Sequence, residues 1–161
     1  MNADDTDPEV SPPARRYQLL GHPADVLGAI AAGGVLGAEA RYGIGVALPQ
    51  DSGGWPWAIL LINVSGCLLI GVLMVVITEL VTPHRLVRPF LGVGVLGGYT
   101  TFSTYTVDVL TQAGAGHPGS AVAYLVLTPI LAVLACAAGA EATRLVTRWI
   151  DDRRRRRGKG A

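Results

Sequence analysis

A ten-residue stretch near the middle of the chain, LGGYTTFSTY at positions 96–105, places glycine, hydroxyl and aromatic residues inside a long apolar run. Glycine and β-branched residues weaken a helix interior, so Gly97 and Gly98 followed by Thr100 and Thr101 predict a break in a membrane helix. A break frees backbone carbonyls, which the membrane interior tolerates only where they are buried in protein, line a cavity or hold an ion. Carbonyl and hydroxyl oxygens around such a break suit a hard cation such as Na⁺.

Two aromatic residues follow the predicted break. Phe102 and Tyr105 are three positions apart and therefore share one helix face. Aromatic ring edges carry partial positive charge, so this pair is suited to face an anion in a dry site. The alternative is an ordinary kinked helix whose aromatic residues pack in the core.

Single polar residues in two other apolar segments are further candidates. Asn63 is the only amide in a very apolar segment, and its donors either face a pore or join two helices. Tyr124 and Thr128 lie four positions apart, on one helix face, directly before Pro129. Their hydroxyls either line a path or accompany a proline kink.

The first apolar segment contains both small and ionisable residues. Gly33 and Gly37 form a G-x-x-x-G pair, which predicts close approach of another helix. Glu39 and Arg41 are costly at membrane depth, where such groups usually face protein or water. They point about 200° apart on a helix, so they are not expected to pair. The alternative for Arg41 is a position near the extracellular end of the span.

Four apolar segments must position these residues, and each is about long enough to cross a hydrocarbon core of roughly 30 Å. The predicted spans are 26–48, 57–80, 88–110 and 121–146. Only 16% of the residues are charged, against roughly 25% in soluble domains. The sequence therefore predicts an all-α membrane protein with four transmembrane helices, the third of them broken.

The spans form one predicted transmembrane domain, residues 23–150, between two tails. Residues 1–22 are acidic, contain proline and are too poor in aliphatic residues to bury a core, which predicts a disordered tail. No apolar stretch directly follows a basic start, as a secretory signal requires. Residues 151–161 form a basic tail, predicted to contact anionic lipid headgroups rather than nucleic acid.

The basic residues also predict the topology. Every Lys and Arg except Arg41 lies before the first span, between spans two and three, or at and after the end of span four. By the positive-inside rule both termini and the middle loop are cytoplasmic. We expect a multi-pass protein of a bacterial-type plasma membrane. The bias also predicts insertion in one orientation. Cys67 and Cys136 are far apart and lack a nearby His or Cys partner, so we interpret them as helix-packing residues.

Three motifs, in order, resemble those of the Fluc/CrcB fluoride channels. They are GGVLGAEARY in span one, NVSGCLLIG in span two and GGYTTFSTY in span three. The resemblance covers the first three spans, with the fourth similar only in character. It implies a channel, not an enzyme, that lets cytoplasmic fluoride leave passively and so reduces its toxicity. It also implies an antiparallel, dual-topology-type dimer with two pores along its interface.

The resemblance implies roles for individual residues. Asn63 would be the amide donor to fluoride, and the ring edges of Phe102 would line the fluoride path. Gly97 and Thr100 would give backbone carbonyls to a central Na⁺, which is structural and not transported. The remaining expected pore residues are Arg41 near the vestibule, Thr101 and Ser103 beside the break, and Tyr105, Tyr124 and Thr128 along the path.

The chain also departs from the family pattern. Tyr105 stands where the motif has a second Phe, so its hydroxyl either bonds across the path or alters it. Ala132 and Cys136 fall at the next polar pore positions of span four and lack good donors. Together with the one-sided charge bias, these departures predict an antiparallel heterodimer with a related Fluc-type subunit, and a homodimer remains open.

Two other functions are compatible with parts of the sequence. A small multidrug-resistance-type exporter is also a four-span antiparallel dimer, in which Glu39 would support proton-coupled exchange. It would leave the GGYTTFSTY stretch without a role. The second is a non-conducting subunit that stabilises a conducting partner.

Overall fold

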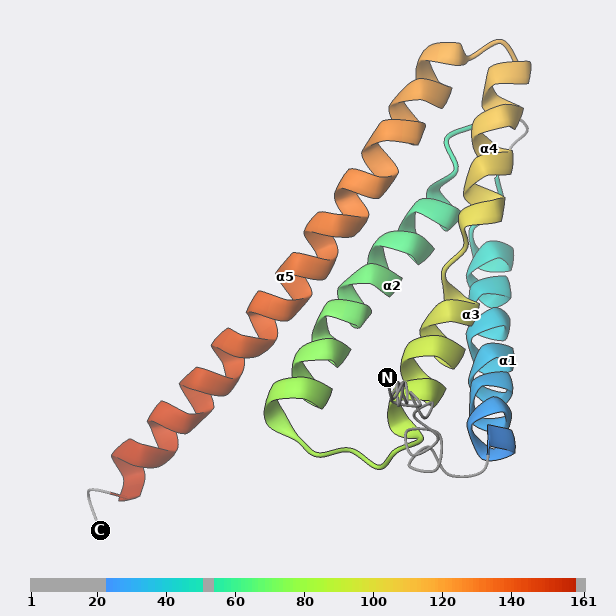
Figure 1. Cartoon of the computed structure of the whole chain (residues 1–161). Helices are drawn as coiled ribbons and strands as arrows, with labels where there is room; N and C mark the ends of the chain where they lie inside the picture. The colour runs from blue at the N-terminus through green and yellow to red at the C-terminus, as the bar shows by residue number, and fades with distance from the viewer. Residues whose placement is uncertain (1–22, 51–53, 159–161) are drawn as a thin grey trace, which may run out of the picture.

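The computed structural model describes residues 23–50 and 54–158, and the regular secondary structure of these residues is all helical. Figure 1 shows an elongated bundle whose last helix runs beside the second one and then extends away from the other helices. The predicted tail at 1–22 lies outside the described residues. The elements are α1 (Pro23–Ala47), α2 (Trp57–Val75), η2 (Val76–Leu80), η3 (Arg88–Leu96), α3 (Gly97–Tyr99), α4 (Phe102–Gly114) and α5 (Pro118–Gly158), where η2 and η3 are π-helical.

Glycines bring α1 into backbone contact with η3 and α3. A Cβ atom at Gly33 or Gly37 would overlap backbone atoms of the facing helix, among them the carbonyl oxygens of Phe90 and Val95. Gly94 and Gly98 meet α1 in the same way from the other side. The predicted close approach at the G-x-x-x-G pair of α1 is therefore confirmed, and η3 and α3 contribute a second pair.

A similar small-residue interface joins α2 to α5, which pack together along much of α2. Gly71 of α2 lies against the carbonyl of Cys136, and Gly139 of α5 lies against the carbonyl of Leu68. Cys67 and Cys136 are free and half-buried, as expected for helix-packing residues.

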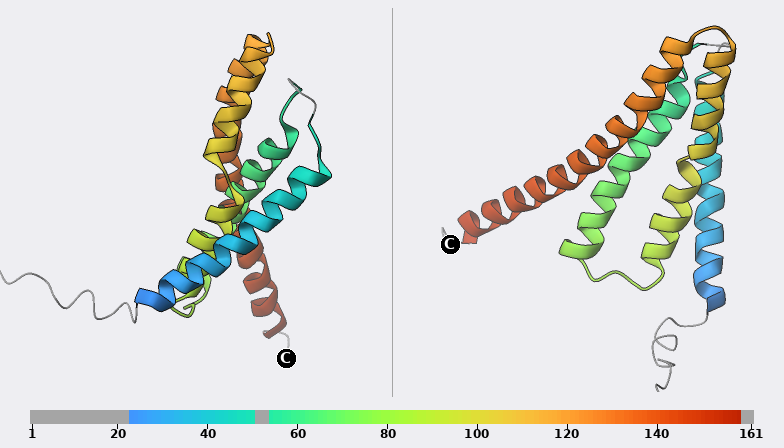
Figure 2. Two further views of the ribbon diagram at one scale, coloured as in Figure 1. Left: turned by 90° about the vertical axis from the view of Figure 1, so that its right-hand side faces the viewer. Right: turned by 45° about the horizontal axis from the view of Figure 1, so that its top comes forward.

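The third segment of the chain changes its packing partner along its length. Its first part, η3 and α3, packs on α1, whereas α4 packs on α5. Both views of Figure 2 show α4 beside the first turns of α5. A small buried cluster of Leu60, Tyr105 and Tyr124 joins α2, α4 and α5 there. The change of partner takes place at the two residues between α3 and α4.

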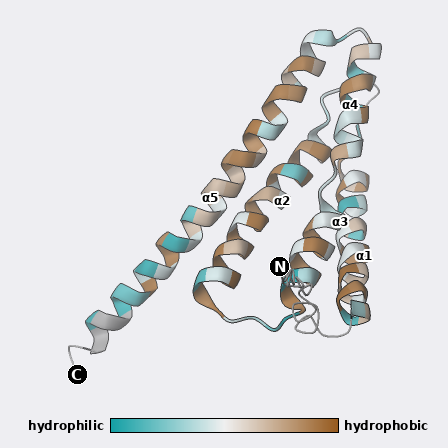
Figure 3. Cartoon of the chain, in the orientation of Figure 1, coloured by the Kyte–Doolittle hydropathy of each residue, from teal (hydrophilic) through white to brown (hydrophobic). Residues whose placement is uncertain are grey.

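Within the described part of the chain, two helical stretches are long and apolar enough to cross a membrane by length and composition, Trp57–Leu80 and Pro118–Arg153. Figure 3 shows the hydrophobic colour along α2 and the first part of α5, and hydrophilic residues towards the C-terminal end of α5. In α1, Glu39 and Arg41 lower the hydropathy, and the third segment is divided into short helices. The first and third spans therefore stay predictions.

Ion pairs tie the helices together at one end of the bundle. In Figure 1 the start of α1, the loop between η2 and η3 and the C-terminal end of α5 all lie towards this end. Arg85 bonds Asp25 at 2.8 Å, and Arg144 bonds Glu79 at 2.7 Å. Helix α5 continues past this level to Gly158, because Arg is a good helix former.

Candidate functional site

Thr100 and Thr101 separate α3 from α4 and have extended backbones. Their φ and ψ angles are −75° and 156° for Thr100, and −147° and 126° for Thr101. The Thr101 hydroxyl accepts the Thr104 amide N–H at 3.2 Å and so caps the N-terminus of α4. The threonines thus end one helix and begin the next.

Asn63 of α2 holds this extended segment through both ends of its amide. Its Nδ2 donates to the Thr101 carbonyl at 2.9 Å, and its Oδ1 accepts the Thr101 N–H at 2.9 Å. We call this pair of hydrogen bonds the Asn63 clamp. Thr101 is only 7% exposed, so its backbone groups depend on the clamp rather than on water.

The break changes what the nearby carbonyls bond. In a continuous α-helix the Thr101 N–H would bond the Gly97 carbonyl, but it bonds Asn63 instead. The Thr100 carbonyl accepts Nη1 of Arg41 at 3.4 Å. Gly97 and Thr100 thus present main-chain oxygens that are not used by the helix ladder, the donor type that a hard cation prefers. Arg41 already brings a positive charge to the Thr100 carbonyl.

A groove of about 290 Å³ opens beside the break, between α2, α4 and α5. Five of the predicted pore residues line it, and Cys67, Pro129 and Ala132 complete its wall. The five are Asn63, Thr101, Phe102, Tyr105 and Thr128, and the backbone neighbour Thr100 also reaches it. Residues from three helices, up to 69 positions apart in the chain, therefore meet in one small volume.

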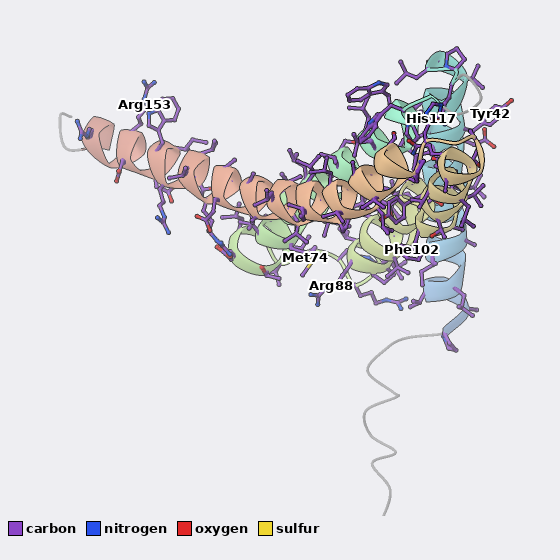
Figure 4. The ribbon with its side chains drawn as sticks, turned by 90° about the horizontal axis from the view of Figure 1, so that it is seen from above. Tyr42, Met74, Arg88, Phe102, His117 and Arg153 are labelled. Atoms are coloured by element: carbon purple, nitrogen blue, oxygen red, sulfur yellow. The ribbon has the colours of Figure 1, made fainter. Side chains whose placement is uncertain are left out.

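Three aromatic rings form a row, of which Phe102 and Tyr105 line this groove. The ring centres of Phe102 and Tyr105 are 5.6 Å apart, and those of Tyr105 and Tyr124 are 5.3 Å apart. Phe102 is 79% exposed, whereas Tyr105 and Tyr124 are buried. Figure 4 shows Phe102 on the surface of the described bundle. Its ring is thus available to whatever lies beside the chain.

The Tyr105 hydroxyl does not cross the groove. It donates to the Leu125 carbonyl at 2.6 Å. In a regular helix that carbonyl would accept an N–H from residue 129, but Pro129 has none. The hydroxyl therefore satisfies a carbonyl that the proline leaves open, while the ring still lines the groove.

The other predicted pore residues lie at its margins. Ser103 is exposed and its hydroxyl lies 3.3 Å from that of Thr101. Arg41 reaches the break from α1. The Tyr124 ring lies behind Tyr105, fully buried, and its hydroxyl bonds no residue in the described part of the chain.

The sequence interpretation missed a set of buried polar groups next to Tyr124. The Asp108 Oδ2, the Gln112 Nε2 and the Trp55 Nε1 are buried without a hydrogen bond to any described residue. Gln112 accepts the Ser120 hydroxyl through its other end. Asp108 lies three positions after Tyr105, and this helical spacing was the available signal. Glu39, in contrast, is exposed on α1, away from these groups.

Comparisons with known proteins agree on one family. A family model described as "CrcB-like protein, Camphor Resistance (CrcB)" matches residues 28–140. "Fluoride-specific ion channel FluC 2" of Streptomyces avermitilis is 52% identical over 119 residues, which are 74% of this chain and 75% of the relative. "Fluoride-specific ion channel FluC 2" of Nocardia farcinica is 46% identical over 138 residues, 86% of this chain and 96% of the relative.

A second protein of Streptomyces avermitilis also matches. It has the name "Fluoride-specific ion channel FluC 3" and is 48% identical over 92 residues, which are 57% of this chain and 45% of the relative. One organism thus has two different proteins that are similar to this chain.

Proposed function

The chain belongs to the CrcB family, and on that basis we propose that it is a fluoride-specific ion channel, an integral membrane protein and not an enzyme. It lets cytoplasmic fluoride leave passively and so lowers its toxicity. The observation that carries the proposal is the groove beside the helix break, where Asn63, Phe102 and Tyr105 meet. Their side chains supply an amide donor and aromatic ring edges in a narrow space.

Fluoride is small and strongly hydrated, so a pore must replace its water with strong donors while a narrow bore excludes larger anions. The Asn63 amide has two N–H groups, and the clamp uses one of them on Thr101. The second is available to the anion. The edges of Phe102 and Tyr105 add partial positive charge, and hydroxyls of Thr101, Ser103 and Thr128 extend the polar track. In this proposal Tyr124 and Arg41 act at the two ends of that track.

We further propose that the break holds a structural Na⁺, which is not transported. The main-chain oxygens of Gly97 and Thr100 would bind it, because the break withdraws them from the helix ladder. The proposal needs no cluster of acidic or His side chains. Replacing Na⁺ by a large organic cation is expected to reduce fluoride efflux and to lower the melting temperature. Unchanged values of both would contradict it.

We also propose that the functional unit is an antiparallel dimer with a related Fluc-type subunit. Two observations support a different subunit rather than a second copy. All basic residues except Arg41 lie at one side of the predicted topology, which favours a single orientation. Streptomyces avermitilis has two similar proteins, FluC 2 and FluC 3, so related pairs occur within one organism. In the proposed topology four spans place both termini in the cytoplasm.

The exporter and non-conducting-subunit interpretations lose support. The described relatives have names of fluoride channels. Glu39, which an exporter would need, is exposed on α1 and has no hydrogen bond or ion pair to the described residues. The groove beside the helix break is lined by residues of other segments, and Glu39 is not among them.

Fluoride efflux from liposomes tests the proposal. The purified chain is reconstituted alone and with a candidate partner, and a fluoride electrode records release. Phe102→Ala is expected to reduce efflux at least tenfold, because it removes the exposed ring from the path. The matched control is Leu110→Ala, since Leu110 is also exposed on α4 but does not line the groove. Equal efflux from the two variants would contradict a conducting role for this chain. Full efflux from the chain alone would contradict the heterodimer.

A further inference from the structure

A second groove, wholly apolar and about 330 Å³ in volume, separates α2 from η3. We call it the α2–η3 groove. Its walls include Val72 and Val76 from the α2 side and Leu91 and Val95 from the η3 side. The fluoride proposal uses none of these residues. Within a bilayer, a groove of this kind is open to an acyl chain.

A basic pocket of about 260 Å³ adjoins the cytoplasmic end of this groove in the proposed topology. It is lined by Ile77, Pro83, His84, Arg85 and Arg88. Ile77 directly follows Val76 of the groove, and Leu91 of the groove follows Arg88 by three residues. The apolar groove and the basic pocket are therefore consecutive along the same two elements.

The charges in the basic pocket suit an anion. Arg85 is held by Asp25, so its charge is already partly balanced. Arg88 is exposed, and it forms no ion pair or hydrogen bond with any other residue within the described ranges 23–50 and 54–158. Figure 4 places its side chain at the outer edge of the bundle. The Nδ1 of His84 accepts the Leu86 N–H at 3.3 Å, which leaves its Nε2 as a donor.

We propose that the basic pocket and the α2–η3 groove together bind one anionic phospholipid from the cytoplasmic leaflet. The headgroup phosphate bonds Arg88 and His84, and one acyl chain lies between Val76 and Leu91. Basic pockets between helices on the cytoplasmic side are typical sites for anionic headgroups. A soluble anion would use only the pocket, and a lipid without a phosphate only the groove. The continuity of the two therefore favours a phospholipid, and the positive charge of Arg88 favours one whose headgroup has a net negative charge.

Native mass spectrometry of the purified full-length chain, with and without its partner, tests the proposal. Phosphatidylglycerol and phosphatidylcholine with the same acyl chains are added separately, and bound lipid is counted. We expect preferential binding of phosphatidylglycerol. Arg88→Gln is expected to weaken it about fivefold, the ratio that corresponds to about 1 kcal/mol for one basic residue near a membrane surface.

The matched control is Arg156→Gln, which removes an exposed arginine of α5 outside the pocket and should leave binding unchanged. Val76→Phe fills the groove and should also weaken binding, and His84→Gln provides a second pocket variant if Arg88→Gln does not fold. Equal binding of both lipids, or equal loss with Arg156→Gln, would overturn the proposal. So would competition by glycerol phosphate at equal concentration, which indicates a soluble anion. Chain-to-chain crosslinking of Val95→Cys that excludes lipid would assign the groove to a second copy. Fluoride efflux is measured separately, so that failure of the lipid proposal can be distinguished from failure of the channel proposal.

Discussion

Replacing Asn63 by Leu tests whether the Asn63 clamp maintains the helix break. The substitution keeps a similar shape but leaves both the N–H and the C=O of Thr101 without their partner. An orphaned buried polar group costs about 1–3 kcal/mol, so the two together cost about 2–6 kcal/mol. Two ordinary side-chain hydrogen bonds between membrane helices would contribute only about 1.2 kcal/mol in total, at about 0.6 kcal/mol each. The expected loss therefore distinguishes a clamp from ordinary helix–helix contacts.

The measurement is the free energy of unfolding in detergent, followed by circular dichroism during denaturant titration. Ser65→Ala is the matched control, because Ser65 lies about half a turn after Asn63 on α2. The Ser65 hydroxyl lies 2.9 Å from the Tyr99 hydroxyl of α3 and bonds no backbone group of the break. Asn63→Asp keeps the acceptor for the Thr101 N–H and removes the donor, so its loss should exceed that of Ser65→Ala. A loss for Asn63→Leu no larger than that of the control would refute the reasoning.

Three further substitutions follow from the contacts described above. Tyr105→Phe should lower the unfolding free energy by about 1–2 kcal/mol, because the Leu125 carbonyl loses its donor. Fluoride efflux should persist, since the ring remains. Abolished efflux would place the Tyr105 hydroxyl in the fluoride path instead. Gly37→Leu should abolish the folded peak in size-exclusion chromatography, whereas Gly43→Ala, which has open space around it, should not; two similar profiles would contradict the backbone contact. Glu39→Gln should leave fluoride efflux within about twofold, because passive conduction has no proton-coupled step, and a large loss would revive the exporter.

Local composition was sufficient to locate some of the helix boundaries. The glycine pair and the threonines mark the place where α3 ends and α4 begins, because their backbone preferences act within a few residues. The second predicted span, 57–80, coincides with α2 and η2. These features depend on neighbours in the chain, which a sequence displays directly.

Pairings over long sequence distances were not predictable in the same way. Asn63 was identified as a polar residue in an apolar helix, but its bond to the Thr101 backbone spans 38 positions. The Tyr105 hydroxyl was expected to affect the path, and its use at Leu125 depends on a proline in another helix. The buried groups around Asp108 passed unnoticed, since only the packing of α4 on α5 brings them beside Tyr124.

The change of packing partner in the third segment has a mechanical consequence. Helix α1 with η3 and α3 forms one packed unit, and α2 with α4 and α5 forms another. The extended backbone of Thr100 and Thr101 is the covalent joint between them along this segment. A displacement of one unit against the other would therefore act on the torsion angles of this joint, because Asn63 fastens Thr101 to the second unit whereas Arg41 of the first unit bonds the Thr100 carbonyl. Gly97 belongs to the first unit and Thr100 to the joint itself, so the separation of their main-chain oxygens depends on how the two units are aligned.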